Sequence, residues 1–278
     1  MADVLTDTFT NFMSQPDSKK DFRVTPPAPT QCKVLIVGEQ ALGRSVLLLA
    51  AVTAASQMGI RVVFFARTQI QSLPVSLQNC VAGLSPESLK KIKFCYPRTL
   101  EELLQQVAGL HEPTNTFPIA PSLIIVDRLE DFLWGRAGDS HSGCHPGEQS
   151  CAAHLSALLC DTATFLTGIL EQQTSSPAPC RVIASYKPKE QSGESSVSDQ
   201  VLDTLDRYFQ VRCTLDQDRS YKAGAAGLQE MWNIYFSGTG ITLEPCTKDT
   251  EIYENSFPAS PRSVAKAPKA VETCVRQS

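Results

Sequence analysis

The sequence predicts one α/β domain in which a mainly parallel sheet carries helices on both faces and antiparallel strands at an edge. Short apolar runs alternate with helical patterns along most of the chain, an order typical of such sheets. The run Lys33–Val37 leads into a segment with two glycines and then an apolar helix. A second run, Leu123–Val126, is wholly apolar and ends at Asp127. These observations place a strand–loop–helix unit at about Cys32–Met58 and a second buried strand in the same sheet.

Composition limits the classes of protein to consider. The chain has 278 residues, 42% of them hydrophobic and 19% charged, which suits one globular domain with irregular ends. A net charge of −4 gives no support for nucleic-acid binding by the whole surface, so such binding would need a local patch. No apolar run approaches the ~18 residues that span a bilayer, and residues 1–23 lack the pattern of a secretory signal. We expect an intracellular protein whose ten cysteines are reduced thiols.

The folded domain is expected at residues 31–246, between a disordered leader at 1–30 and a disordered tail at 247–278. The leader ends in a proline-rich segment, and the tail has too few apolar residues to offset the entropy of ordering. The elements expected between them are strands at 33–37, 61–66, 92–95, 123–126 and 182–185, and helices to 58, from 85, from 99, at 149–173 and at 201–208. Three late runs, Phe209–Leu215, Trp232–Phe236 and Ile241–Glu244, alternate as antiparallel edge strands do.

Local signals mark where two of the helices begin. Ser85 suits the cap of the short helix, and Pro86 suits its first position. Thr99 precedes Glu101 and Glu102, and acidic residues in a first turn interact favourably with the helix dipole. The long helix is indicated by apolar residues at steps of three and four: Leu155, Leu158, Leu159, Phe165, Leu166, Ile169 and Leu170.

Residues 38–45 fit the phosphate-binding pattern G-x-x-x-x-G-K/R-S/T. They are Gly38, Glu39, Gln40, Ala41, Leu42, Gly43, Arg44 and Ser45. The glycines permit a tight turn in which backbone N–H groups surround a polyphosphate, and the following helix adds its positive end. Arg44 keeps the charge of the usual lysine, although its planar fork is not equivalent to an ammonium. The alternative interpretation is an ordinary strand-to-helix loop.

A carboxylate at the end of a buried strand is the second feature of such a site. Asp127 supplies it, and an acid in this place holds Mg²⁺, usually through water. The alternative is an aspartate that only caps the next turn. With Ser45 as a second magnesium ligand through its hydroxyl, the two features predict that the chain binds ATP with Mg²⁺, and that Asp127 and Arg44 take part in any catalysis.

The order of these segments resembles the core of RecA-type recombinases and their paralogues. The likeness rests on Leu123–Asp127, the loop and long helix that follow, and Val182–Ser185 with its polar loop. Shorter segments resemble one subfamily, the SWIM-type zinc-finger-associated proteins, which are ATPase-like subunits of the Shu complex in homologous recombination. These segments are Leu89–Pro97, Leu159–Ala163, Arg207–Phe209 and Trp232–Phe236. The resemblance covers roughly residues 33–245.

The resemblance implies a RecA-like fold and a nuclear protein that promotes or stabilises recombinase filaments in double-strand-break repair. It implies as partners a SWIM-domain zinc-finger protein, a RecA-type recombinase with its paralogues, and single-stranded DNA. The recombinases place DNA-contacting loops where this chain has Lys187, Lys189 and Arg136. Basic residues near an aromatic one suit single-strand binding, although a solvated surface is the alternative interpretation of the two lysines.

Three departures from the recombinase pattern bear on catalysis. Arg44 replaces the loop lysine. Arg67 lies where the recombinases have a glutamate that positions the attacking water, and Ser185 and Tyr186 lie where they have an asparagine–glutamine pair. Because positioning and charge stabilisation make up most of phosphoryl-transfer catalysis, we expect a weak, DNA-stimulated ATPase at most. The alternatives are a non-hydrolysing scaffold and, less favoured because no arginine-rich lid follows Asp127, a small-molecule kinase.

Five cysteine and histidine residues lie close together in the sequence. They are His141, Cys144, His145, Cys151 and His154. All are zinc ligands by type, but structural zinc sites usually show tighter paired spacings. We therefore interpret them as a loop beside a packed helix and assign the zinc of this system to the partner.

Overall fold

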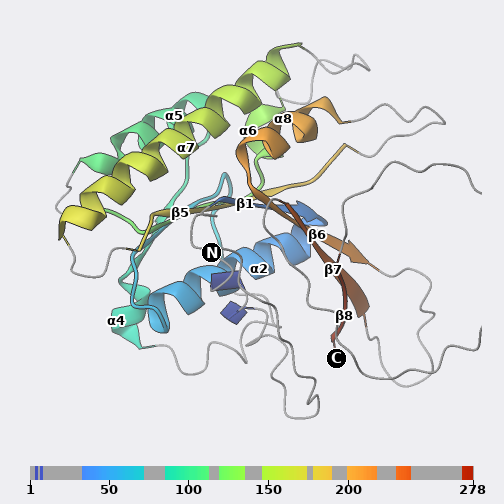
Figure 1. The fold of residues 1–278 in the computed structure, drawn as a ribbon, viewed down its shortest axis with the longest axis horizontal. Helices are drawn as coiled ribbons and strands as arrows, with labels where there is room; N and C mark the ends of the chain where they lie inside the picture. The colour runs from blue at the N-terminus through green and yellow to red at the C-terminus, as the bar shows by residue number, and fades with distance from the viewer. Residues whose placement is uncertain are drawn as a thin grey trace, which may run out of the picture.

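An eight-stranded sheet forms the centre of the computed structural model (Figure 1), and its strand order is β3-β2-β4-β5-β1-β6-β7-β8. The structure describes residues 4–5, 7–8, 33–71, 85–112, 119–134, 146–173, 178–189, 199–217, 230–238 and 271–277. The strands are β1 (Lys33–Gly38), β2 (Val62–Phe65), β3 (Ile92–Cys95), β4 (Leu123–Val126), β5 (Arg181–Tyr186), β6 (Val211–Gln217), β7 (Glu230–Gly238) and β8 (Val271–Gln277). Strands β1 to β6 pair in parallel, whereas β7 and β8 are antiparallel additions at one edge. The prediction of an α/β core with a mainly parallel sheet and antiparallel strands at an edge is confirmed.

Helices cover both faces of this sheet (Figure 1). On one face lie α2 (Gln40–Ser56) and α4 (Pro86–Leu89), and on the other lie α5 (Leu100–Ala108), α7 (Pro146–Gln173) and α8 (Gln200–Tyr208). Two short helices, η1 (Gly109–His111) and α6 (Glu130–Leu133), are also described. Alternate residues of a strand point to opposite faces, so Val34 and Ile36 join the core under α2, whereas Leu35 and Val37 join the core under α7.

Helix α7 is the longest described element. Its residues Gly147–Gln172 are long and apolar enough to cross a membrane by length and composition, a test that core helices of soluble proteins also pass. In this fold the helix buries Leu155, Leu159 and Leu166 in the core of its face and contacts α5 and α8. Core packing therefore accounts for its apolar side chains.

Both predicted helix starts are confirmed. The Ser85 hydroxyl accepts a hydrogen bond from the backbone N–H of Ser88 at 3.1 Å, with Pro86 at the first helical position. The Thr99 hydroxyl accepts one from the N–H of Glu102, also at 3.1 Å. Each cap satisfies a donor that has no partner within its own helix.

The edge beyond β1 differs from the prediction. Strand β6 was expected to be antiparallel, but it pairs in parallel with β1. The reason is that α8 carries the chain back across the sheet before β6 begins, as a parallel crossover requires. Among the described strands, the antiparallel pairs are β6 with β7 and β7 with β8. Val211 of β6 lies opposite Gly238 of β7, and Trp232 of β7 lies opposite Val275 of β8. The predicted strand Ile241–Glu244 lies outside the described residues.

The two chain ends also contain structure where disorder was expected. Strand β8 lies in the predicted tail and pairs with the backbone groups that β7 would otherwise leave free at the edge of the sheet. In the predicted leader, the four described residues are helical, and Val4 and Leu5 are buried in the core under α2. The remainder of 1–30 lies outside the described residues, as does 247–270.

Gly38 ends β1 in a backbone conformation that side chains rarely adopt. Its φ is 153°, and a Cβ atom there would collide with the carbonyl oxygen of Leu215 and lie 2.9 Å from the Cβ of the same residue. Leu215 faces Gly38 directly in the β1–β6 ladder. The parallel pairing of these two strands therefore requires glycine at this position.

We predict that Gly38→Ala lowers the free energy of unfolding by about 1–3 kcal/mol or more, because the new methyl group forces β1 and β6 apart. Urea denaturation measures the change. Gly168→Ala is the matched control, since it lies within α7 with no atom inside 4 Å of its added Cβ and should raise stability by about 0.5–1 kcal/mol. Equal stability of Gly38→Ala and the unchanged chain would contradict the steric argument.

Candidate functional site

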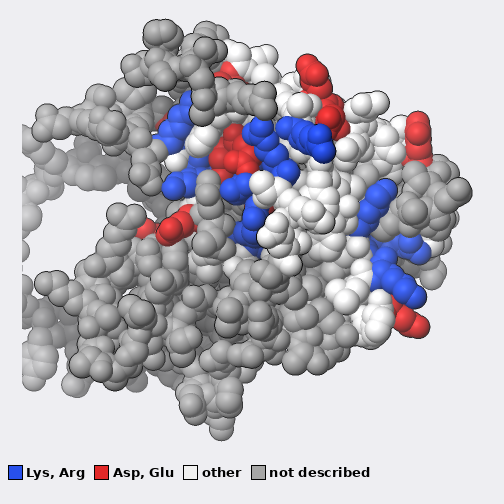
Figure 2. Space-filling view, turned by 180° about the vertical axis from the view of Figure 1, so that it is seen from behind, with Lys and Arg blue, Asp and Glu red and all other residues white. Residues whose placement is uncertain are grey.

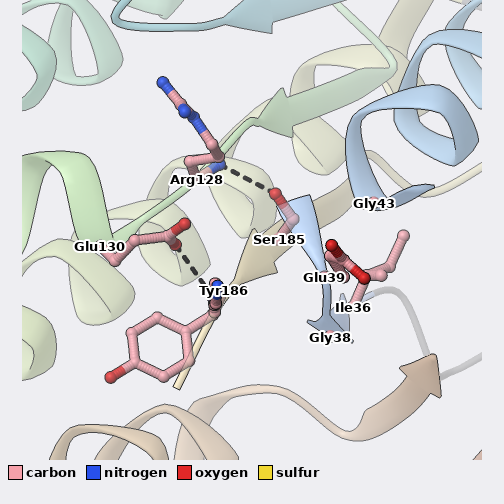
Figure 3. A pocket seen from close by; sticks show the side chains of 9 residues that line it. Ile36, Gly38, Glu39, Gly43, Arg128, Glu130, Ser185 and Tyr186 are labelled. Atoms are coloured by element: carbon pink, nitrogen blue, oxygen red, sulfur yellow. Dashed lines mark hydrogen bonds between the residues drawn. The ribbon is translucent and has the colours of Figure 1, made fainter. Parts of the chain in front are cut away.

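The carboxyl ends of three parallel strands meet at one edge of the sheet. Strand β5 lies between β1 and β4, so the ends of these strands bring Gly38, Asp127 and Tyr186 to the same edge, where ligands of open α/β sheets bind. A pocket is present there (Figure 3). It is lined by Ile36, Gly38, Glu39, Gly43, Arg128, Glu130, Ser185, Tyr186 and Lys187. The sequence features predicted to act together are therefore adjacent.

The phosphate-binding segment is wound into a helix. Helix α2 begins at Gln40, directly after an extended Glu39, and the N–H of Gly43 donates to the carbonyl of Glu39 at 3.0 Å. The expectation of an open loop before the helix is therefore wrong for this conformation. The physical reason is that the N–H of Gly43 is satisfied by the carbonyl four residues earlier, as in any α-helix. The first turn still presents N–H groups that have no partner within the helix.

Arg44 forms an ion pair with the aspartate at the end of β4. Its Nε donates to Oδ2 of Asp127 at 2.7 Å, and its Nη2 donates to the hydroxyl of Thr68 at 3.1 Å. The Asp127 side chain is fully buried, whereas that of Arg44 is 27% exposed. Ser185 donates from its hydroxyl to the other oxygen of Asp127 at 3.3 Å. Burial raises the pKa of Asp127, and the charge of Arg44 acts in the opposite direction.

This arrangement does not fit the predicted magnesium site. Mg²⁺ needs carboxylate and hydroxyl oxygens that are free to face it in octahedral geometry. Both oxygens of Asp127 already accept hydrogen bonds, one of them from a guanidinium. Ser45 lies in the second turn of α2, is 7% exposed and has a polar partner of its own. The proposed ligand pair, Ser45 and Asp127, is thus committed to other contacts.

Glu130 is a site residue that sequence reasoning missed. It is 1% exposed, lies in α6, and accepts the backbone N–H of Lys187 on Oε2 at 3.0 Å (Figure 3). Burial raises its pKa to about 7, only partly opposed by hydrogen bonds to backbone N–H groups. The available signal was a second acid three residues after Asp127, between Leu129 and Asp131. Glu130 joins the loop after β4 to the segment after β5.

The other two departures from the recombinase pattern also have defined partners. Arg67 donates from Nη1 to the carbonyl oxygen of Asp131. A cation therefore occupies the place that the sequence comparison assigned to the water-positioning glutamate of the recombinases. Ser185 accepts the N–H of Arg128 at 2.8 Å, and Tyr186 donates from its hydroxyl to Asp199 at 2.9 Å. These side chains hold the edge of the sheet together.

Arg128 has an unusual conformation for its residue type. It is the one non-glycine residue with a positive φ, 57°, in the part of the chain that the structure describes, and such backbone strain is concentrated at functional sites. Its side chain pairs with Asp131, yet its Nε is buried and has no hydrogen-bond partner among the described residues. A buried donor of this kind, beside the pocket, suits an anionic ligand.

The predicted DNA-contacting residues are engaged in local contacts. Lys189 has its Nζ 2.8 Å from a carboxylate oxygen of Glu148 and 5.2 Å from the ring centre of Trp134. Trp134 in turn meets Tyr186 edge to face, with centroids 6.2 Å apart. Lys187 lines the pocket. Arg136 lies outside the described residues.

Charged side chains gather on the face seen in Figure 2, which is turned by 180° from the view of Figure 1. In Figure 2, Lys and Arg side chains surround a smaller group of Asp and Glu side chains, beside residues that are not described. A local basic patch can therefore exist on a chain whose net charge is −4.

The five cysteine and histidine residues between 141 and 154 are described only in part. His141, Cys144 and His145 lie outside the described residues. Cys151 packs against the core under α7. The described residues contain no group of three or more potential metal ligands.

We predict that the buried Glu130 makes stability depend on pH. Its folded pKa of about 7 lies above the ordinary 4.5, so the folded state favours the protonated acid. Its contribution is complete below pH 4.5 and is lost as the pH rises through 7, by up to roughly 3 kcal/mol. Glu130→Gln should flatten this fall in urea denaturation at pH 5 and pH 8. Glu101→Gln, which removes an exposed acid of α5, should keep the wild-type fall; identical pH dependence in all three chains would refute the assignment.

Comparison with known proteins identifies relatives. No protein-family model matches the chain. Among solved structures, the RadB recombinase is 15% identical with a TM-score of 0.46, covering 74% of this chain and 80% of that one. A KaiC-like protein from the archaeon Pyrococcus horikoshii is 9% identical with a TM-score of 0.43, covering 76% of this chain and 79% of that one.

Two curated proteins are more similar in sequence. Mouse ATPase SWSAP1 is 33% identical over 186 residues, which are 66% of this chain and 58% of that protein. Human ATPase SWSAP1 is 31% identical over 218 residues, which are 74% of this chain and 86% of that protein. With this identity maintained over most of the human protein, the chain belongs to the ATPase SWSAP1 family.

Proposed function

We propose that this chain is a homologous-recombination mediator subunit of the nucleus that binds ATP and single-stranded DNA. With a SWIM-domain zinc-finger partner, it promotes or stabilises recombinase filaments during double-strand-break repair. The observation that carries the proposal is the 31% identity to human ATPase SWSAP1 over 86% of that protein. The meeting of Gly38, Asp127 and Ser185 at one edge of the sheet supports the nucleotide-binding part.

Nucleotide binding requires the start of α2 to change. Even with its open mouth counted, the pocket has only about 190 Å³ of empty space, less than the roughly 300–1,000 Å³ of typical small-molecule sites. Unwinding the first turn of α2 would enlarge it and free backbone N–H groups for phosphate oxygens. The nucleotide would thus select an opened form of the first turn of α2, which precedes Arg44.

Gly43 supports this opening. It is helical here, and an added Cβ would meet only the Cβ of Ser185 at 3.9 Å, an ordinary contact. Glycine within a helix costs about 1 kcal/mol relative to alanine, so the wound conformation gives no reason for a glycine. Close approach of a phosphate to the opened backbone does give one.

Single-stranded DNA binding is proposed for the same edge. Trp134 offers an aromatic ring, and Lys187 and Lys189 lie nearby after β5, a combination that suits stacked bases and a phosphate backbone. For Lys189 to contact DNA it would exchange its bond with Glu148. Such an exchange costs little, because an exposed ion pair is worth about 1 kcal/mol or less.

A scaffold that acts only through protein partners is the second candidate. The Arg44–Asp127 pair and the wound first turn of α2 favour it, since both close the phosphate site. Arg67 favours it too, because a guanidinium cannot accept a proton from an attacking water. We therefore propose weak hydrolysis at most.

We predict that Gly43→Ala separates nucleotide binding from stability. The added methyl group stabilises the wound helix by about 0.5–1 kcal/mol and obstructs the opened loop, so affinity for ATP should fall at least about tenfold. Titration with a fluorescent ATP analogue and urea denaturation measure the two quantities. Gly168→Ala stabilises a remote helix and should bind as the unchanged chain does. Unchanged affinity in Gly43→Ala would refute the opening of the first turn, and absence of ATP binding in the unchanged chain would favour the scaffold.

Co-purification from cells tests the mediator role itself. The tagged chain should recover a SWIM-domain zinc-finger protein and a RecA-type recombinase after nuclease treatment, as direct protein contacts predict. Mass spectrometry of the recovered proteins gives the result. Recovery of neither protein would refute the mediator role and leave the fold and family unaffected.

A further inference from the structure

We propose that Arg44 takes the place of Mg²⁺ in this chain, so that its phosphate site binds a nucleotide without a divalent cation. The inference rests on the nucleotide-binding part of the proposed function and concerns which counter-ion that site uses. It arises because Mg²⁺ needs oxygen ligands that face it, whereas the oxygens of Asp127 accept hydrogen bonds from Arg44 and Ser185.

Arg44 is held by two directed contacts with residues that follow two different strands. Nε binds the carboxylate at the end of β4 at 2.7 Å, and Nη2 binds Thr68, beyond the end of β2, at 3.1 Å. A planar guanidinium matches such paired acceptors, whereas a lysine ammonium is a point charge on a flexible stem. The guanidinium is also always protonated. A lysine could swing between aspartate and phosphate, but this arginine is positioned as a permanent counter-charge.

The burial of Asp127 makes this counter-charge necessary. Its side chain has no exposed surface, and a buried carboxylate without a partner is strongly unfavourable. Whether Mg²⁺ binds directly or through water, it needs an oxygen of Asp127 that faces the ion or its water, and the guanidinium already holds one of them. A displaced Arg44 would then repel the ion at short range. One cation at Asp127 excludes the other.

The site still has positive groups for a polyphosphate. Two of the five N–H donors of Arg44 make the bonds seen among the described residues, and its side chain is partly exposed. Arg128 lines the pocket and has a buried Nε without a partner in the described part of the chain. The start of α2 adds backbone N–H groups. Arginine is well suited to phosphate because its donors are arranged in a fork.

Glu39 and Glu130 also line the pocket. Their charges oppose an anion that arrives without a metal. Glu130 is held by the N–H of Lys187 and is half protonated near pH 7, which reduces this repulsion. A nucleotide diphosphate or triphosphate is therefore expected to bind weakly, and with the same affinity whether or not Mg²⁺ is present.

Direct metal binding gives a test that needs no nucleotide. The probe is Mn²⁺, followed by electron paramagnetic resonance on the full chain. The unchanged chain and Asp127→Asn should bind Mn²⁺ equally, because Asp127 contributes no metal site while Arg44 is present. Arg44→Ala leaves the carboxylate without its cation and should gain a Mn²⁺ site, which Arg44→Ala/Asp127→Asn should lose. Arg67→Ala, which removes an arginine held by a carbonyl instead, should gain none.

A Mn²⁺ site in the unchanged chain that disappears in Asp127→Asn would overturn the proposal, as would an Arg44→Ala chain that folds and gains no site. If Arg44→Ala does not fold, the comparison of the unchanged chain with Asp127→Asn decides the matter alone.

Nucleotide titration separates this inference from the proposed function. The affinity for a fluorescent ATP analogue should differ by less than twofold between buffers with EDTA and with Mg²⁺. A tenfold or greater gain with Mg²⁺ would overturn the role of Arg44 while supporting nucleotide binding. Absence of binding in both buffers would refute nucleotide binding, and the Mn²⁺ measurement would still judge Arg44.

Discussion

The ion pair between Arg44 and Asp127 joins helix α2, which follows β1, to the end of β4, a strand that does not pair with β1. Strand β5 separates β1 from β4, so no backbone ladder connects the start of α2 to the end of β4. Arg44 crosses this gap by a side-chain contact, and Ser185 at the end of β5 completes the connection by donating to the same carboxylate. Because Asp127 is buried, loss of its partner would leave an uncompensated charge in the core. The pair therefore fixes the second turn of α2 against the end of β4.

The two glycines of the phosphate pattern serve different purposes. Gly38 is required by the fold, because any side chain would collide with β6. Gly43 has room for a side chain in the present conformation, so its purpose must lie in another one. A motif that reads as a unit in the sequence is thus partly a feature of strand pairing, and only its Gly43 part bears on the proposed nucleotide binding. A glycine at position 38 in another member of this family would therefore not indicate nucleotide binding, because the fold requires it. A glycine at position 43 would be the more informative of the two.

Features that depend on neighbouring residues could be predicted from the sequence, and those that depend on distant contacts could not. The fully apolar run Leu123–Val126 and the caps Ser85 and Thr99 carry their own physical signals, and the structure has each where it was expected. The direction of β6, the addition of β8 and the burial of Val4 and Leu5 follow from which element lies beside them. The same holds for Arg44, whose partner is 83 residues away in the sequence, and for Glu130, whose importance comes from the N–H of Lys187.

The contacts at this edge also separate binding from hydrolysis in physical terms. Hydrolysis needs a side chain that positions a water molecule beside the terminal phosphate, a role that a carboxylate or an amide can take. Arg67 cannot provide it, and Asp127 is neutralised by Arg44. Glu130 is the remaining acid at the end of β4 that lines the pocket, yet it is buried, half protonated near neutral pH and bonded to the backbone after β5. It could orient a water only by giving up that bond. Binding, by contrast, needs only backbone donors and fixed cations, which the edge retains. The free energy of nucleotide binding would then be used to open the start of α2, which makes the nucleotide a ligand that selects a conformation of this edge.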